Sequence, residues 1–332
     1  MKAPIWQMVG EKFLSNIYLR VMINFIKTAI LHLMTQSVEF KSGNTICRGV
    51  LYEPKRGEGN GAGIVLAHGF AGTIDSGLLE YAEGFAKAGF HALAFDYRGF
   101  GLSDGAPRQH ISVPQQREDW RAAIAHLRTH EAVGVDRIGL WGISFSGGHV
   151  IYLAHEDDAI RGLVAQVPAV DAHLNAMLGN YKRGAEASEA LIKVVKKDLK
   201  DSFLGGQHNM LAVAPEANKG PAILGASEAQ IYPKIAGETW HNRVTARSLL
   251  TGKFELNNAT ELSDVLTTPM LLQISVDDET VSNESIKTFA RRCGSLATLK
   301  HYDGGHFSLL QTPGRQQALD DAVTYFQSQL IL

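Results

Sequence analysis

Short apolar runs alternate with amphipathic patterns along residues 38–170 of the chain. The runs are rich in Val, Ile, Leu and Ala, which is typical of strands buried on both faces, whereas the segments between them show the helical period of 3.6. Strands that alternate with helices form βαβ units, so the pattern predicts an α/β fold with a mainly parallel sheet. The expected strands are 37–41, 48–52, 63–67, 92–95, 137–141 and 163–165, and the expected helices are 78–88, 115–129 and 147–154.

The pattern changes after about residue 170, where helix-like sequence such as 187–200 and 239–250 replaces the strand series. From Pro269 the earlier rhythm resumes, with strands expected at 270–276 and 298–302 and helices at 285–293 and 315–330. We therefore expect one α/β core, formed by residues 37–170 and 267–332, with a helical insertion at 171–266. An open α/β sheet binds ligands beyond the carboxyl ends of its strands, so the insertion is a predicted lid.

Residues 1–36 are expected to form an amphipathic helical extension. Apolar residues between Leu14 and Leu33 follow a helical stripe, and Lys12, Arg20 and Lys27 lie on the opposite face. A membrane-spanning helix needs about 20 mostly apolar residues, and a signal peptide needs an uninterrupted apolar region, so neither fits. Three interpretations stay open. The helix contacts the core or a second subunit, or it binds to a membrane surface. The third is an artefact of start-codon choice, because Met34 stands just before the first expected strand and could be the true start.

Composition narrows the class of protein. A chain of 332 residues with 45% hydrophobic and 20% charged residues can bury a sizeable core. The formal net charge of −2 gives no reason to expect a nucleic-acid partner. Two cysteines, Cys47 and Cys293, make neither a disulfide framework nor a metal set, which favours a reducing, cytoplasmic location. No metal ion or organic cofactor is expected.

The stretch GISFSGG at residues 142–148 lies between a predicted strand and a predicted helix. A serine at so sharp a turn takes a strained backbone, and small residues two positions before and after it let the chain cross closely. Both Ser144 and Ser146 could occupy the turn. Ser144 follows the expected strand end at Trp141 more closely, so we predict that Ser144 is a nucleophile, with Ser146 as the alternative.

A candidate acid and a candidate base follow Ser144 along the chain. Asp277 and Asp278 come directly after the strand expected at 270–276, where a carboxylate could orient a histidine; Asp278 is preferred and Asp277 is the alternative. His306 stands in a glycine-rich loop between the last expected strand and the last helix, where a neutral imidazole could accept the serine proton. The order Ser144, Asp278, His306 is that of the hydrolase fold.

Two backbone N–H groups are candidates for an oxyanion hole. Gly69, in the sequence HGF after a predicted strand, allows the N–H of Phe70 to turn into the site. The N–H of Phe145 lies at the start of the helix that follows Ser144, where the helix dipole favours negative charge.

These motifs together resemble the α/β-hydrolase superfamily of serine hydrolases over about residues 38–330. The nearest branch resembles the dienelactone-hydrolase-like and X-prolyl-peptidase-like (S15) esterases, which include hydrolases and acyltransferases of polyketide pathways. The resemblance implies Ser144 as nucleophile, Asp278 as acid, His306 as base, and Phe70 and Phe145 as oxyanion donors. The motifs that carry it are HGF at 68–70, DYRGFGLSDG at 96–105, WGISFSGGH at 141–149, VDDETV at 276–281 and GGHF at 304–307.

Some residues depart from this pattern or compete with it. Ser146 stands where the family usually has glycine, and Asp96 and Arg98 match a loop that is mainly structural in the family. His126 and His130 have a spacing that can bind metal on a helix, but they lie beside an apolar stripe and no third ligand is evident, so a solvated flank is favoured. We expect His149 to be a packing residue.

The predicted function is a serine hydrolase that cleaves a carboxylic ester or thioester of a small molecule through an acyl-enzyme. One alternative keeps the same triad but transfers the acyl group to a second substrate instead of water. Another is a non-catalytic protein that uses the fold to bind a ligand; an intact set of serine, aspartate and histidine disfavours this reading.

Overall fold

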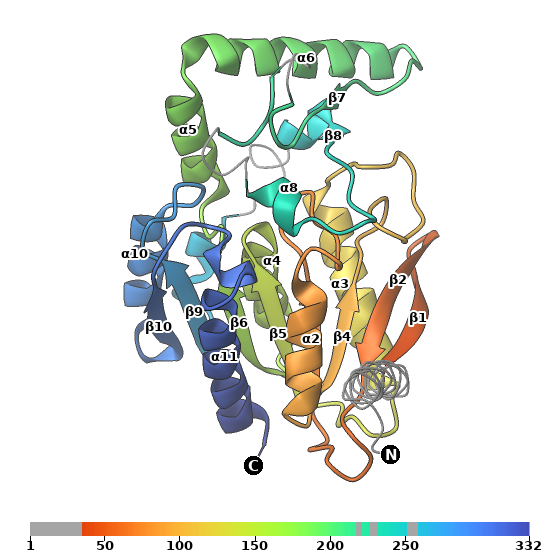
Figure 1. Cartoon of the computed structure of the whole chain (residues 1–332), viewed down its shortest axis with the longest axis vertical. Coiled ribbons are helices and arrows are strands. Elements are labelled where there is room, and N and C mark those ends of the chain that lie inside the picture. Colours follow the sequence, from red (N-terminus) through yellow and green to blue (C-terminus); the bar gives the residue numbers. More distant parts are fainter. Residues whose placement is uncertain (1–34, 217–220, 226–230, 251–257, 332) are drawn as a thin grey trace, which may run out of the picture. The chain divides into compact units, whose positions relative to one another are not determined.

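The computed structural model describes residues 35–216, 221–225, 231–250 and 258–331. Its eight-stranded sheet has the order β1-β2-β4-β3-β5-β6-β9-β10 (Figure 1). β2 pairs with β4 in the antiparallel direction, whereas the pairs from β4 to β10 are parallel, which confirms the predicted mainly parallel sheet. The strands are β1 (Thr35–Ser42), β2 (Thr45–Tyr52), β3 (Gly63–Ala67), β4 (His91–Phe95), β5 (Ile138–Ile143), β6 (Ile160–Gln166), β9 (Met270–Ser275) and β10 (Ala297–Tyr302).

Helices cover both faces of this sheet, as βαβ connections require. α2 (Leu78–Lys87) and α11 (Gly314–Leu330) contact each other and pack on one face, and α3 (Val113–Arg128) and α4 (Phe145–Glu156) pack on the other. α10 (Asn283–Cys293) lies against β9 and β10. Because both faces are covered, every residue of β3, β4 and β5 is buried.

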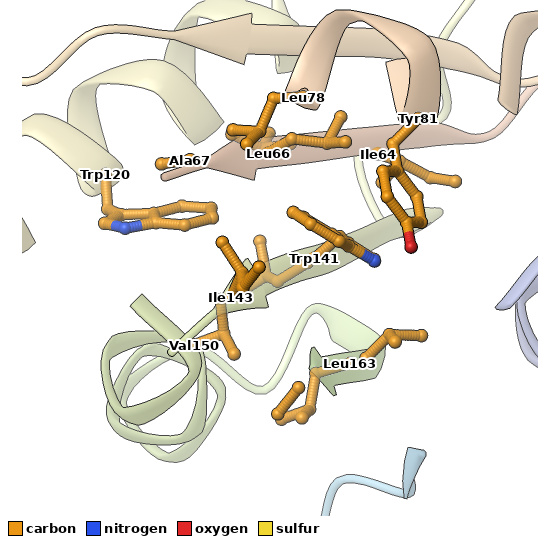
Figure 2. Close-up of a cluster of buried hydrophobic side chains, with 14 of the residues drawn as sticks. Ile64, Leu66, Ala67, Leu78, Tyr81, Trp120, Trp141, Ile143, Val150 and Leu163 are labelled. Carbon is orange, nitrogen blue, oxygen red and sulfur yellow. The ribbon is translucent and has the colours of Figure 1, made fainter. Parts of the chain in front are cut away.

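The core is built from large side chains that these strands and helices contribute. Figure 2 shows Ile64 and Leu66 of β3 and Trp141 of β5 gathered with Tyr81 of α2. The rings of Tyr81 and Trp141 lie 4.5 Å apart, and both side chains are fully buried. Complete burial of one such aliphatic or aromatic side chain stabilises the fold by about 1.5–3 kcal/mol, so this cluster holds β5 rigidly in place. The serine turn starts from the end of that strand.

The predicted lid, residues 171–266, contains α5 (Ala172–Arg183), α6 (Ala185–Phe203), the short α8 (Tyr232–Ile235) and the two-stranded pair β7 (Met210–Leu211) and β8 (Val244–Thr245). Figure 1 shows α5, α6 and α8 beyond the carboxyl ends of the parallel strands. The Asp171 side chain caps α5 by accepting the N–H of Leu174 at 2.8 Å. That this segment acts as a lid stays a prediction.

One predicted helix of this segment, 239–250, is wrong. Residues Val244–Thr245 form β8, and Ala246–Leu250 form a single 3₁₀ turn. The backbone N–H of Thr245 bonds to Gln109 O at 2.9 Å, and that of Arg247 bonds to the buried Asp198 carboxylate at 3.1 Å. These long-range partners take the N–H groups that a helix would have used, so tertiary contacts override the local helical pattern.

The amphipathic extension expected at residues 1–36 lies outside the described residues except for Thr35 and Gln36, where β1 begins. In the part of the chain that the structure describes, no helix is both long enough and apolar enough to cross a membrane.

Candidate active site

Ser144 occupies the sharp turn between β5 and α4. Its backbone has φ 56° and ψ −117°, a conformation that an L-residue adopts at a cost of about 1–3 kcal/mol. Hydrogen bonds hold this geometry: the Ser144 N–H donates to Gln166 O at 2.8 Å, and the Ser144 carbonyl accepts from Gly147 and Ala169, both at 2.9 Å. The strained turn is therefore fixed by the neighbouring strand and helix, and it presents the serine hydroxyl beyond the sheet.

The two candidate serines have different partners. Ser144 Oγ lies 2.9 Å from His306 Nε2. Ser146 is fully buried, and its Oγ lies 2.9 Å from the hydroxyl of Tyr97, which in turn accepts from Trp120 Nε1 at 2.7 Å. The turn needs a residue without a side chain at position 142, since a Cβ on Gly142 would lie 2.5 Å from Ser146 O. The geometry therefore favours Ser144 over Ser146.

His306 and Asp278 continue the hydrogen-bonded chain that starts at Ser144. His306 Nδ1 lies 2.7 Å from Asp278 Oδ2, and both side chains are buried. The other carboxylate oxygen of Asp278 accepts the N–H groups of Thr280 and Val281 at 2.8 and 3.0 Å. A carboxylate held in this way keeps the histidine proton on Nδ1 and leaves the Nε2 lone pair toward the serine hydroxyl.

The two loops that carry these residues follow neighbouring parallel strands, β9 and β10. A backbone hydrogen bond from Asp277 N to Gly304 O, 3.1 Å long, joins them. The Asp277 residue is exposed, and its neighbour Asp278 points to the histidine. Of the two carboxylates that the sequence left open, the structure thus brings Asp278 to His306.

The loop after β3 lies directly against the serine turn. A Cβ on Gly69 would lie 3.0 Å from the Ser144 Cβ, so this close approach needs glycine. The Gly69 carbonyl lies 2.9 Å from His68 Nδ1, and because a carbonyl only accepts, His68 Nδ1 is the donor. In a trans peptide the Phe70 N–H points away from the Gly69 carbonyl, so the bond from His68 fixes the direction of that N–H.

His68, which stands in the HGF motif, was not among the site residues predicted from the sequence. Its side chain is buried, and burial lowers its pKa to about 4, so the ring is neutral at pH 7. A neutral ring with its proton on Nδ1 suits the bond to Gly69 and adds no positive charge near Ser144.

Segment 232–240 of the predicted lid is bonded to the same loop. The Tyr232 hydroxyl donates to Phe70 O at 3.2 Å, and Trp240 Nε1 donates to Ala71 O at 3.0 Å. The Thr239 N–H adds a bond of 2.8 Å to the Asp75 carboxylate. The first two bonds hold the carbonyl groups of Phe70 and Ala71, which follow the candidate oxyanion donor, the Phe70 N–H, along the chain. The insertion therefore supports the geometry of this loop.

A cavity of about 50 Å³ adjoins Ser144 and His306. The surface that lines it is mostly apolar, which suits an apolar group next to Ser144. The apolar residues of the lining are Phe70, Leu78, Ile143, Leu224, Phe307 and Leu310.

Other residues of the motifs are structural. Asp96 is buried and accepts the N–H groups of Ile74 and Leu102, and burial raises its pKa to about 6. Arg98 pairs with the buried Asp119 at 2.7 Å. His149 is buried with Nε2 at 3.0 Å from Gln116 Oε1, as expected of a packing residue.

Comparison with known proteins agrees with this fold. A family model described as Hydrolase_4: Serine aminopeptidase, S33 matches residues 60–313. The chain is 29% identical over 294 residues to the quorum-quenching protein AidA of Acinetobacter baumannii, covering 87% of this chain and 93% of AidA. It is 25% identical over 307 residues to the polyketide transferase claH of Penicillium crustosum, covering 89% and 97% of the two chains.

Two further similarities concern a shorter segment and the fold. The thiohydrolase aneE of Aspergillus aculeatus is 38% identical over 125 residues, which is 38% of each chain. The crystal structure of the α/β hydrolase GrgF from a Penicillium species superposes with a TM-score of 0.75 at 20% identity, covering 90% of this chain and 99% of that one. The α/β-hydrolase fold expected from the motifs is confirmed.

Proposed function

Because the chain belongs to the S33 serine aminopeptidase family of α/β hydrolases, we propose that it is a serine hydrolase that cleaves a carboxylic ester or thioester of a small molecule. The observation that carries the proposal is the unbroken chain Ser144–His306–Asp278, with distances of 2.9 and 2.7 Å. Acyl-transfer enzymes use a serine in this arrangement as the nucleophile. The imidazole accepts the serine proton, and the carboxylate stabilises the imidazolium.

In the acylation step, Ser144 Oγ attacks the substrate carbonyl carbon while His306 Nε2 takes the hydroxyl proton. Asp278 stabilises the imidazolium that forms. The carbonyl oxygen becomes an oxyanion and accepts hydrogen bonds from the N–H groups of Phe70 and Phe145. When the tetrahedral intermediate collapses, His306 returns the proton to the leaving alcohol or thiol, and the acyl group stays on Ser144.

In the deacylation step, His306 takes a proton from water, whose oxygen attacks the acyl carbon. The second tetrahedral intermediate then releases the acid, and Ser144 recovers its proton. The reaction uses no group outside the chain, the substrate and water.

The lining of the cavity favours an ester or thioester over a peptide with a free amino end. Recognition of an α-ammonium group needs a carboxylate or several carbonyl acceptors near the scissile bond. Among the described residues that line the cavity there is no Asp or Glu, and the lining surface is mostly apolar. An uncharged acyl group with apolar substituents fits this surface.

A second candidate function is acyl transfer with the same three residues. The relative claH is described as a polyketide transferase, and aneE as a thiohydrolase. Both chemistries begin with the same acyl-enzyme and differ in whether water or a second substrate accepts the acyl group.

A substrate screen tests the proposed function. We expect the purified chain to hydrolyse p-nitrophenyl esters or acyl thioesters, with a dependence on acyl length, and Ser144→Ala to lack this activity. Product analysis with and without an added alcohol or amine then separates the two candidates: mainly free acid supports the hydrolase, and mainly the new ester or amide supports the transferase. If neither the esters nor the thioesters are consumed in any reaction, both candidate functions are wrong.

A further inference from the structure

A cluster of metal-ligating side chains lies at the end of the sheet opposite the candidate active site. Glu53 directly follows β2, His91 is the first residue of β4, and His130 comes two residues after α3. The serine turn and the loops of the acid and the base follow the carboxyl ends of the parallel strands, whereas His91 starts β4. The five residues of β4 separate the two ends by roughly 15 Å at about 3.3 Å per residue.

The topology of the fold explains why these three residues meet. In the antiparallel pairing of β2 with β4, Tyr52 lies opposite Ala92, so the next pair along the ladder is Glu53 and His91. Residues opposite each other in such a pair project from the same face of the sheet. α3 packs against β3 and β4, and the chain that leaves its end carries His130 to the same place.

The distances are those of a three-residue ligand set. One ligand atom from each of Glu53, His91 and His130 lies within 4.8 Å of the other two. His130 Nε2 is 3.1 Å from Glu53 Oε1, and the rings of His91 and His130 are 4.7 Å apart. Tetrahedral zinc with bonds of about 2.0–2.1 Å places its ligand atoms about 3.4 Å apart. One pair already meets this spacing, and the half-exposed Glu53 and His130 side chains can move toward His91.

His91 supplies an independent sign of a missing partner. Its side chain is only 4% exposed, and Nδ1 is a buried nitrogen without a hydrogen-bond partner in the described part of the chain. Buried polar atoms are nearly always satisfied, and one that is not calls for a partner such as an ion. The imidazole that carries this nitrogen lies beside a second imidazole and a carboxylate, a setting that suits a bound cation.

We propose that Glu53, His91 and His130 bind a zinc ion that joins β2, β4 and the end of α3. Two imidazoles and a carboxylate suit Zn²⁺, and the partly exposed side of the cluster leaves room for water as the fourth ligand. Because the cluster is far from Ser144 and lies on elements of the core, its role is to stabilise the fold and not to take part in the reaction.

Binding changes the hydrogen bonds of His130. Its Nε2 now faces the Glu53 carboxylate as a donor, and its Nδ1 accepts the Ala132 N–H at 3.3 Å. Coordination through Nε2 requires that nitrogen to be free of hydrogen, so the ring proton moves to Nδ1 and the long bond from Ala132 is given up. The metal bond replaces a weak hydrogen bond at the end of the helix.

The histidine pair on α3 that the sequence offered as a metal motif is a different arrangement. His126 lies four residues before His130, but its ring stacks on Phe40 with centroids 5.5 Å apart. Both histidines are partly exposed. Only His130 of this pair belongs to the cluster, and the other two ligands, Glu53 and His91, come from the sheet. His126 therefore serves as a matched control.

The test uses the full chain after treatment with a chelator. Zinc is titrated by calorimetry, and Co²⁺ is added separately to record the visible spectrum of its coordination. We expect one equivalent of zinc, an intense Co²⁺ spectrum typical of tetrahedral or five-coordinate sites, and a rise in Tm of about 4 °C at a hundredfold excess of zinc over its Kd. Glu53→Gln and His130→Gln should weaken zinc binding at least about a hundredfold, and His126→Gln should leave it unchanged.

Three outcomes would overturn the proposal. The unsubstituted chain shows no saturable zinc binding, or Glu53→Gln and His130→Gln bind zinc as tightly as the unsubstituted chain, or His126→Gln loses zinc binding. His91→Gln is a further variant, but His91 is buried and its replacement can impair folding. The half-exposed Glu53 therefore decides the question. No readout depends on hydrolysis, so the result is separate from that of the proposed function.

Discussion

At the scale of single residues, two serines only two positions apart have unrelated surroundings. Ser144 faces His306, whereas Ser146 is bonded to Tyr97 inside the core. The position of each serine relative to the strand end was readable from the sequence and favoured Ser144. The bond between Ser146 and Tyr97 was not, because it joins residues 49 positions apart whose meeting depends on how α4 and β4 pack. Ser146, which stands where the family usually has glycine, therefore has a structural role, because its hydroxyl is bonded to a buried tyrosine.

His68 is the residue whose replacement tests the oxyanion geometry. His68→Leu removes the Nδ1–H that holds the Gly69 carbonyl, and we expect kcat to fall about tenfold to a hundredfold with little change in KM, since the lost alignment matters most in the transition state. His68→Asn, whose amide can reach roughly the position of Nδ1, should recover part of kcat. Steady-state kinetics with one p-nitrophenyl ester checks this; equal kcat values in the two variants would remove the positioning role.

At the scale of elements, most strands and helices of the core could be predicted because apolar runs and helical periodicity report burial directly. The predicted strand 63–67 has the same bounds as β3, and the helix expected at 78–88 corresponds to Leu78–Lys87. The expected strand end at Trp141 was two residues short of Ile143, since Gly142 interrupts the apolar run. The insertion was harder to predict, because its short strands and turns depend on partners far along the chain.

The bonds from segment 232–240 to the loop after β3 predict a kinetic effect of changes in the insertion. Tyr232→Phe and Trp240→Phe each remove one bond to a carbonyl of that loop, so we expect kcat to fall several-fold while the fold persists. Tyr181→Phe is the matched control, because Tyr181 lies on α5 of the same insertion and is 86% exposed. Kinetics and circular dichroism of the three variants measure this; a similar loss in Tyr181→Phe would show that the effect is not local.

At the scale of the whole molecule, buried and half-buried histidines make the stability of the fold depend on pH. Burial lowers the pKa of His68 to about 4 and that of His149 well below its usual value, and burial with the nearby Arg247 lowers that of His110 to about 4. Between these values and about pH 6.5 the unfolded chain binds more protons than the folded one, so stability is lost as pH falls through this range. The raised pKa of the buried Asp96 acts in the opposite direction and offsets part of the loss.

We therefore expect the free energy of unfolding to decrease by several kcal/mol between pH 7 and pH 4.5, since one buried histidine with the shift of His68 contributes about 3 kcal/mol. Urea titrations followed by circular dichroism at pH 7, 5.5 and 4.5 measure the change. A free energy that stays constant or increases toward pH 4.5 would contradict the assignment of these histidines as neutral and buried.

Covalent labelling by a fluorophosphonate tests whether Ser144 is the nucleophile of an acyl-enzyme. The reagent reacts only with a serine activated by its base, so peptide mapping of the labelled, folded protein identifies that serine. We predict one label on Ser144, normal labelling of Ser146→Ala, and no labelling of Ser144→Ala or of His306→Ala. Labelling that persists in Ser144→Ala, or an unlabelled folded wild-type chain, would exclude Ser144 as the nucleophile.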